Sequence, residues 1–546
     1  PALGDDINPS TGELSVSFDD LSVVSRGVKT FFTRTYRSKL DYNGPIGHGW
    51  NFAYNQLLAP QADGSIALAD GTGYIVTFTP DGAGGFQAPA GIYLVLTRNS
   101  GGTYTIRERG GIRRNFLESG LLSSLVDRNN NQISLEYDAS FNLTTIRDCI
   151  GRPITLTYSF DGLLQTVTDF TGRVVRYAYD ADANLIEVTL PPSPAFPAGR
   201  ATRYTYSSGQ SSPELNHNLL TITDPNGQTY LENTYDNQDR VATQRFNSGT
   251  FRLDYQEPLV RTTVTDREDN QTAYFFDAAG HTTSMTRHTR GLRASDPPSY
   301  TSTMRYNAHG ELLEQVLPRG NSVSYVYDDQ NPDRLAQKNL LEERRKSGTA
   351  GTGADLVTTY TYEPRFQLIK TITPPRGNDP TEGPPARFQS TFFYDYEEAP
   401  ELLGTDLNGD GTTSQNCGNL VKAVFPSTAI PDFNGLPAGT NAVVMKYTYD
   451  ENGLLRTQTL PTGTRNRIDY FTNTGLPNDP NSREGYASAL VRDVDGAAAT
   501  TTFERDARGN ITAATDPRGN KTVFEYSPSN RVLSTAAPAP SETPRP

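Results

Sequence analysis

A spacing of 21 residues recurs through most of this chain and limits what it can fold into. It links a series of tyrosines, with one arginine in an equivalent place: Tyr137, Tyr158 and Tyr179; Tyr306 and Tyr327; Tyr449 and Tyr470; Arg505 and Tyr526. Asp127, Asp148 and Asp169 keep the same step. Self-similarity at a fixed period is the sequence signature of a repeat protein. The 546 residues therefore measure the number of repeats rather than the number of domains.

Each repeat has the pattern of a β-hairpin. In residues 174–190 an alternating run ends in Asp180, a polar tetrad follows, and a second alternating run returns. Asp, Asn and Gly favour tight turns, and alternation places Tyr177 and Tyr179 on one face and Arg176 and Ala178 on the other. A lone hairpin is marginal in water, so the hairpins are expected to add edge to edge into one long sheet that twist coils into a spiral or shell.

The repeated Tyr and Asp are interpreted as structural residues. The tyrosines are expected to stack along the sheet, and the aspartates to start turns through side-chain to backbone hydrogen bonds. Exposed rows of tyrosine that bind carbohydrate are the alternative. The aspartates concerned are Asp138, Asp180, Asp236, Asp277, Asp328 and Asp450.

Composition excludes several classes of protein. Two cysteines rule out a disulfide scaffold, and five scattered histidines without an H-E-x-x-H pair argue against a zinc protease. A net charge of −13 argues against a nucleic-acid partner. No apolar run approaches the ~20 residues that span a bilayer, and the first residues do not resemble a signal peptide. Only residues 333–347 are expected to form a short helix.

The motif Y-x-Y-D with x-x-G-x-L, alternating with D-P-x-G-N turns, resembles the YD-repeat or RHS-repeat family over roughly residues 110–535. The N-terminal segment resembles the domain that precedes such repeats, at these residues: Gly12, Arg34, Thr35, Tyr36, Gly47, Gly49, Trp50 and Tyr54. The resemblance implies a hollow, cocoon-like β shell that encloses cargo or presents attached domains, secreted by or on the surface of a bacterium. The self-cleaving core of toxin-bearing relatives is not matched, so no self-cleavage is expected.

The expected organisation is all-β. A small N-terminal β domain takes residues 1–109, the hairpin array takes residues 110–536, and a Pro-rich tail takes residues 537–546. Inserted loops that interrupt the repeat are expected at about 191–200, 290–299, 347–355, 374–387 and 400–440. Loop insertions usually project from one face of a repeat array, and the alternative is neutral variation in loop length.

One segment resembles a calcium loop. Asp406, Asn408 and Asp410 match loop positions 1, 3 and 5, Gly411 matches position 6, and Thr412 offers its carbonyl at position 7. Position 12 is Cys417, so the usual carboxylate is missing. Asp395 or Glu397 would supply this carboxylate only if folding brings one of them near the loop. The alternative is a turn without metal; no other cofactor is expected.

No catalytic group is predicted. Cys149 and Cys417 are interpreted as buried free thiols, with a disulfide as the alternative. No G-x-S-x-G or phosphate-binding glycine loop stands in the chain.

The sequence thus predicts a non-enzymatic shell segment whose partner is a protein, either cargo or other copies of itself. A self-assembling surface protein that pairs through open sheet edges is one alternative. A glycan-binding or glycan-active protein is another.

Overall fold

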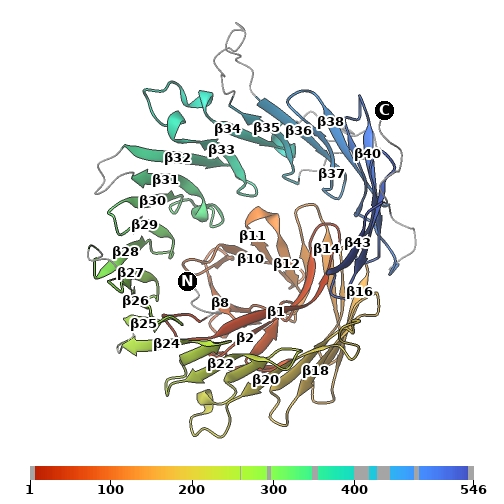
Figure 1. Cartoon of the computed structure of the whole chain (residues 1–546). Helices are drawn as coiled ribbons and strands as arrows, with labels where there is room; N and C mark the ends of the chain where they lie inside the picture. Colours follow the sequence, from red (N-terminus) through yellow and green to blue (C-terminus); the bar gives the residue numbers. More distant parts are fainter. Residues whose placement is uncertain are drawn as a thin grey trace.

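The computed structural model describes residues 7–256, 258, 260–291, 295, 297–346, 354–398, 417–426, 443–472 and 479–538. It is almost entirely β, as predicted, with one long antiparallel sheet of 34 strands in which every strand pairs with its neighbours in sequence. The sheet curls into a ring (Figure 1). The last strands lie beside the early repeats near β14 and β16, so the ring makes one full circuit.

The long sheet runs through the following strands: β10 (Leu94–Arg98), β11 (Tyr104–Glu108), β12 (Arg113–Phe116), β13 (Leu122–Val126), β14 (Gln132–Tyr137), β15 (Leu143–Arg147), β16 (Pro153–Tyr158), β17 (Leu164–Thr168), β18 (Val174–Tyr179), β19 (Leu185–Leu190), β20 (Arg200–Tyr206), β21 (Leu219–Thr223), β22 (Thr229–Tyr235), β23 (Val241–Phe246), β24 (Gly249–Gln256), β25 (Arg261–Thr265), β26 (Gln271–Phe276), β27 (Thr282–His288), β28 (Ser299–Tyr306), β29 (Leu312–Val316), β30 (Ser322–Tyr327), β31 (Leu340–Lys346), β32 (Asp355–Tyr362), β33 (Ile369–Thr373), β34 (Ser390–Tyr394), β35 (Leu420–Phe425), β36 (Val443–Tyr449), β37 (Leu455–Thr459), β38 (Arg465–Tyr470), β39 (Ala487–Arg492), β40 (Ala499–Arg505), β41 (Ile511–Thr515), β42 (Lys521–Tyr526) and β43 (Val532–Ala536).

Three smaller sheets precede it, and they lie inside the ring (Figure 1). They comprise β1 (Ser15–Val23), β2 (Thr30–Arg37) and β5 (Trp50–Phe52); β3 (Asn43–Gly44) and β4 (Gly47–His48); and β6 (Leu57–Pro60), β7 (Ile66–Ala69), β8 (Ile75–Pro80) and β9 (Phe86–Gln87). The long sheet begins at Leu94 rather than near residue 110, where the sequence placed the start of the array.

Most hairpins of the long sheet carry the same irregularity next to the repeat residue, and the β24–β25 hairpin, with Tyr255, is an exception. In β18 the pairing with β19 shifts between Ala178 and Tyr179, and in β16 the pairing with β17 shifts between Thr157 and Tyr158. A bulge of this kind bends a strand and increases its local twist. Because the bulge recurs at one position of successive hairpins, the bends add in one direction and coil the sheet.

The turns follow the predicted aspartate chemistry. Oδ1 of Asp138 accepts the backbone N–H groups of Ser140 and Asn142, each at 2.9 Å. Asp148 and Asp169, at the opposite end of the hairpins, accept N–H groups two and four residues on in the same way. Asp328 differs, because its side chain accepts from the Asn331 amide instead.

The predicted helix at 333–347 is wrong. Residues Ala336–Lys338 form a single 3₁₀ turn, and Leu340–Lys346 form β31, paired with both β30 and β32. Leu, Glu, Lys and Arg favour a helix locally, but two flanking strands satisfy the backbone of this segment, so the tertiary context overrides propensity. In the part of the chain that the structure describes, the other short helices are the 3₁₀ turns Arg109–Gly111, Pro213–Leu215, Pro375–Gly377 and Pro385–Arg387, and α1 (Asp395–Glu398).

The interrupting segments contain more regular structure than the sequence suggested. The segment 400–440, expected to be a loop, includes the described strand β35, which pairs with β34 and β36. Within 374–387 lie two of the 3₁₀ turns. Parts of 290–299 and 347–355, most of 400–440 and most of the tail fall outside the described residues.

Candidate functional site

The N-terminal sheets pack on the inner face of the ring through a buried polar cluster. Nε of Arg34 lies 2.7 Å from Oδ2 of Asp20, and an Nη of Arg34 donates to the Tyr204 hydroxyl of β20. The Tyr177 hydroxyl of β18 donates to Asp20, and Trp50 donates to the hydroxyl of Tyr206. Burial raises the pKa of Asp20, and Arg34 opposes that rise. The cluster joins the first 50 residues to the wall of the ring.

The inner face of the ring is covered in its first half and uncovered in its second. The position two residues before each repeat aromatic faces inward, as Tyr177 does toward Asp20. In the first half, this position is 2 to 8% exposed at Leu135, Leu156, Tyr177, Tyr204, Asn233, Leu253 and Tyr274. In the second half, the same position is only partly buried at Met304, Tyr325, Tyr360, Phe392, Tyr447, Ile468, Phe503 and Phe524.

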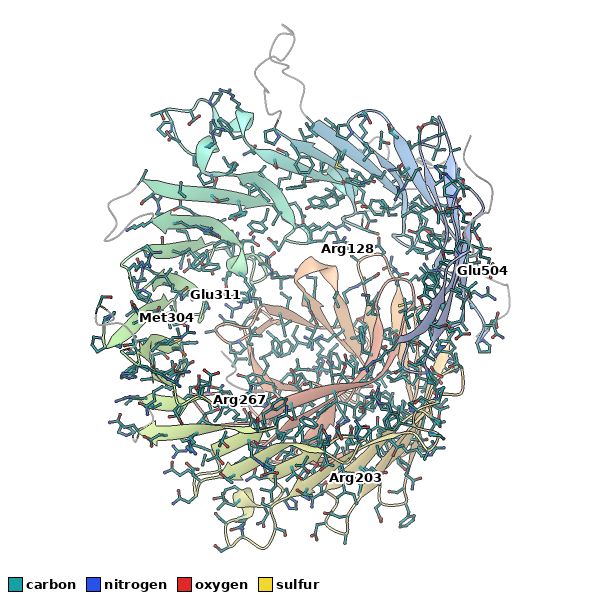
Figure 2. The ribbon with its side chains drawn as sticks, viewed as in Figure 1. Arg128, Arg203, Arg267, Met304, Glu311 and Glu504 are labelled. Carbon is teal, nitrogen blue, oxygen red and sulfur yellow. The ribbon has the colours of Figure 1, made fainter. Side chains whose placement is uncertain are left out.

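This contrast follows from where the core lies. The buried hydrophobic cluster runs from Ile7 to Tyr274 and takes in the N-terminal sheets. The second half of the ring carries large apolar side chains at its inward positions, and nothing in the described part of the chain covers them fully (Figure 2). These side chains form an apolar inner wall that the described residues leave partly exposed.

The repeat tyrosines brace neighbouring hairpins with their hydroxyl groups. Tyr137, Tyr158 and Tyr179 donate to the carbonyls of Leu122, Leu143 and Leu164, each 15 residues earlier, at 2.7 to 2.8 Å. Tyr470 donates to Leu455 in the same way, and Tyr306 donates to Thr282. Arg505 replaces the tyrosine in its repeat, and its Nε donates to the Ala487 carbonyl at 2.8 Å.

These tyrosines lie on the inner side of the sheet and their rings pack into it. Burial raises the pKa of Tyr449 and Tyr470 to about 12, so the hydroxyl groups stay protonated donors. Hydroxyl groups that bond to the sheet itself are not presented to a carbohydrate. The spacing of the tyrosines was visible in the sequence, but their acceptors were not.

The two ends of the circuit meet along a line of turns, which we call the seam. Arg152 is fully buried, and it pairs with Asp148 in its own turn at 2.8 Å. It donates to the carbonyl of Val24 at 2.7 Å and to the carbonyl of Ala507 at 2.6 Å. Its guanidinium group also lies 4.0 Å from the ring centroid of Phe170.

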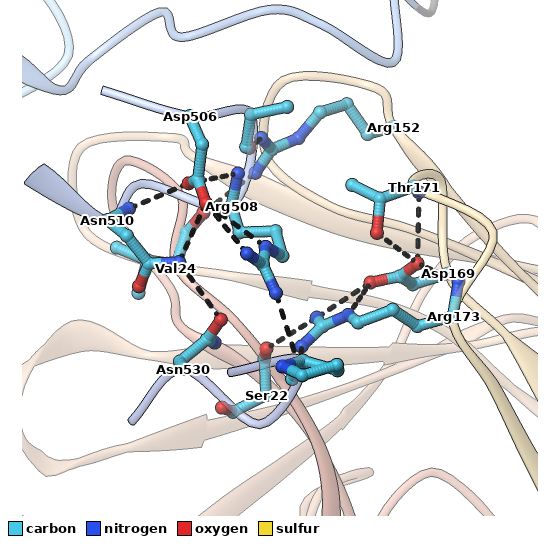
Figure 3. A network of polar contacts seen from close by, with 12 residues as sticks. Ser22, Val24, Arg152, Asp169, Thr171, Arg173, Asp506, Arg508, Asn510 and Asn530 are labelled. Carbon is cyan, nitrogen blue, oxygen red and sulfur yellow. Dashed lines mark hydrogen bonds and ion pairs between the residues drawn. The ribbon is translucent and has the colours of Figure 1, made fainter. Parts of the chain in front are cut away.

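Arg173 repeats the arrangement one hairpin later (Figure 3). It pairs with Asp169 at 2.7 Å and donates to the Pro528 carbonyl at 2.6 Å. Earlier in the seam, the Asn131 amide donates to the Asn452 carbonyl, and the Asn419 amide donates to Asn129. The seam is thus polar, and it depends on side chains that the aspartate turns hold in place.

The predicted calcium ligands Asp406, Asn408, Asp410 and Thr412 lie outside the described residues, and calcium binding stays a prediction. Neither proposed replacement carboxylate is free for it. Asp395 accepts the N–H groups of Cys417, Gly418 and Asn419, and Glu397 pairs with Lys370 at 2.8 Å. Among the described residues, no group of three His, Cys, Asp or Glu side chains is arranged to hold a metal ion.

Both cysteines are buried thiols without a disulfide, in line with the favoured interpretation. Burial raises the pKa of each to about 11, so neither is a thiolate at neutral pH. Within the described ranges, no helix has the length and apolar character needed to cross a membrane.

Two family matches agree with this geometry. Residues 490–541, which cover the hairpins β40–β41 and β42–β43, match the RHS Repeat family. The chain thus contains an RHS repeat in these last hairpins. Residues 4–78, which run from before β1 into β8, match a domain of unknown function named DUF6531.

Curated relatives match part of this chain. The tRNA nuclease WapA of Bacillus subtilis (strain 168) and the tRNA3(Ser)-specific nuclease WapA of Bacillus spizizenii are each 29% identical over 139 residues. That segment is 25% of this chain and 6% of either relative. The chain therefore spans a small fraction of the length of the curated relatives that it matches.

Solved structures with a similar arrangement come from toxin complexes. The crystal structure of TcdB2-TccC3 is 13% identical, with a TM-score of 0.45 over 87% of this chain and 24% of that chain. The Photorhabdus luminescens Tc holotoxin pore with the TccC3-D651A mutation is 11% identical, with a TM-score of 0.39 over 96% and 29% of the two chains.

Proposed function

We propose that this chain is a wall segment of a hollow RHS shell that receives a polypeptide cargo and has no catalytic activity of its own. The main support is the difference in burial of the inward-facing side chains between the two halves of the ring. Positions that the N-terminal sheets bury in the first half are aromatic or aliphatic and partly exposed in the second. Export from a bacterial cell, or display on its surface, is part of the same proposal and rests on the RHS match.

A polypeptide fits this surface better than a small ligand does. The inward side chains are spread over many strands from β28 to β42, so a ligand must be long to contact several of them. Large rings such as Tyr325, Phe392 and Tyr447 offer apolar contact area without demanding a fixed sequence. An extended or unfolded chain exposes side chains of the matching kind.

The test is binding of an unfolded polypeptide, reduced and carboxymethylated α-lactalbumin, measured by fluorescence anisotropy. Tyr325→Ser with Tyr447→Ser removes two inward rings and is expected to weaken binding at least about tenfold. The matched control is Val326→Ser with Val523→Ser, because these side chains are 48% and 41% exposed on the outer face. Equal binding by both double variants would overturn the proposal.

Self-assembly through an open edge is the second candidate. All five residues of β43 are exposed, with Val532 at 55% and Leu533 at 57%, and β43 pairs on one side with β42. An exposed edge strand of this kind pairs readily with another chain. Sedimentation of the wild type and of Leu533→Lys distinguishes this candidate, because only edge pairing predicts oligomers that the lysine abolishes.

A further inference from the structure

Four arginine side chains line one pocket of about 400 Å³ on the seam. Arg107 and Arg113 come from β11 and β12, Arg128 comes from the turn before β14, and Arg365 comes from the turn between β32 and β33. Phe366 and Cys417 complete one side. The pocket thus joins the beginning of the RHS sheet to strands more than half a circuit later, and Arg128 lies on the inner side of the ring (Figure 2).

The positive charge of this pocket is not balanced by the described chain. No carboxylate residue lines it. Arg113 donates to Asn130 at 2.7 Å, whereas Arg107, Arg128 and Arg365 make no ion pair or hydrogen bond with any side chain that the structure describes. A guanidinium group cannot lose its proton at physiological pH, so its repulsion from its neighbours is relieved only by a counter-charge.

The neighbouring carboxylates already have partners. Asp127 accepts the N–H groups of Asn129 and Asn131, and Asp395 accepts those of residues 417–419. Glu363 is 1% exposed and accepts the N–H groups of Arg365 and Phe366. These carboxylates hold turns in place, and none of them forms an ion pair with an arginine side chain of the pocket.

The backbone around the pocket is fixed. The N–H of Gly110 donates to the Phe366 carbonyl at 2.9 Å, which joins the two parts of the sheet directly. A Cβ atom on Gly111 would lie 2.6 Å from the Phe366 ring, so the two segments are in close contact. Arg107 and Arg365 are exposed while Arg113 and Arg128 are half-buried, which leaves the guanidinium groups reachable from solvent.

We propose that this pocket binds a compact multivalent oxyanion, a polyphosphate or a polycarboxylate, and that the bound anion ties the start of the RHS sheet to the later repeats. Guanidinium groups bind both kinds of oxyanion through paired N–H donors. The volume suits a small ligand rather than a macromolecule. Anion binding in this pocket is independent of cargo binding, because the pocket residues belong to the seam and not to the uncovered inner wall.

Isothermal titration calorimetry with tripolyphosphate and with citrate, at constant ionic strength, tests the proposal on the full chain. One binding site is expected, and the tighter of the two ligands identifies the kind of oxyanion. Arg128→Gln with Arg365→Gln is expected to weaken that binding at least about tenfold. Arg176→Gln is the matched control, since Arg176 is an exposed arginine of β18 outside the pocket, and it is expected to leave binding unchanged.

A second variant guards against misfolding. Arg365 is exposed, so Arg365→Gln alone is expected to keep the fold and still weaken binding several-fold. The ligand is also expected to raise the thermal midpoint of the wild type and not that of the double variant. No saturable binding by the wild type, or equal binding by the wild type and Arg365→Gln, overturns the proposal.

Discussion

Arg152 and Ala507 are 355 residues apart in the chain, yet the guanidinium group of one donates to the carbonyl of the other at 2.6 Å. Arg173 and Pro528 are also 355 residues apart, with the same 2.6 Å contact. Both members of the second pair lie 21 residues beyond the first. The 21-residue step is therefore the same on both sides of the seam, and the contact recurs when both sides advance by one hairpin.

Substitution of Arg152 is expected to loosen the seam. Arg152→Ala leaves Asp148 buried without its partner and removes donors to Val24 and Ala507, which we expect to cost about 3–5 kcal/mol locally. Arg152 also donates to the Ser482 carbonyl at 3.2 Å. Hydrogen exchange in residues 482–486 and 506–510 measures the effect, since both turns lose a hydrogen bond to Arg152. Arg176→Ala, on the outer face, is expected to change stability by less than about 0.5 kcal/mol. Unchanged exchange in both turns would contradict the role of the seam.

Removal of a repeat hydroxyl is expected to have a small effect where the hydroxyl is bonded. Tyr158→Phe loses the hydrogen bond to the Leu143 carbonyl, and we expect a loss of about 1 kcal/mol in unfolding by urea. Tyr526 is the matched control, because its hydroxyl has no hydrogen bond within the described chain. Tyr526→Phe is expected to be neutral. A similar loss of stability in both variants would show that the hydrogen bond between the Tyr158 hydroxyl and the Leu143 carbonyl is not its cause.

The buried pair between the N-terminal sheets and the wall is expected to show strong coupling. Asp20→Ala leaves the Arg34 guanidinium buried and unpaired, at an expected cost of about 3–5 kcal/mol. Adding Arg34→Met removes the uncompensated charge, so the double variant is expected to recover much of the loss. The free energy of unfolding of each variant is measured by chemical denaturation. If the losses of the two single variants add up in the double variant, the pair does not hold the two parts together.

Acid is expected to weaken the turns. Hydrogen bonds from the turn N–H groups and from Asn side chains lower the pKa of Asp138, Asp224 and Asp516 below 3.8. The three carboxylates thus bind protons less readily in the folded chain than in the unfolded chain. The stability that the ionised carboxylates contribute is therefore present at neutral pH. It is lost as the pH falls below about 4, through the folded pKa values.

To measure the contribution of these carboxylates to stability, the wild type is compared with the triple variant Asp138→Asn, Asp224→Asn and Asp516→Asn. Urea midpoints at pH 7 and pH 3 are the measurement. The gap between the two proteins is expected to narrow at pH 3, because Asn does not titrate. A gap that stays constant between the two pH values would assign the turns' stability to backbone geometry rather than to the carboxylates.

The hairpins could be predicted because their determinants are local. Asp138 and Asp180 accept N–H groups two and four residues away. The residues that determine the turn and its flanking strands therefore lie within a single repeat. The segment 333–347 was mispredicted because its strand depends on β30 and β32, and its own residues favour a helix.

What the sequence did not reveal depends on where distant segments lie. Tyr177 and Tyr447 occupy the same place in the repeat, but only Tyr177 is buried, because the N-terminal sheets lie against its half of the wall. The arginine pocket combines Arg107 and Arg128 with Arg365, and no multiple of the 21-residue period separates Arg365 from either of them. The seam partners of Arg152 were equally invisible before the circuit was known.

The bulge that recurs beside the repeat tyrosines constrains how such a wall changes during evolution. A residue inserted within a strand would turn its inward side chains outward, and it would also displace every later turn along the seam. Gain or loss of a complete hairpin pair leaves both faces intact and moves the seam contacts by one register. The capacity of the enclosure is therefore expected to vary in steps, one repeat at a time, while length changes of other sizes are confined to the turns.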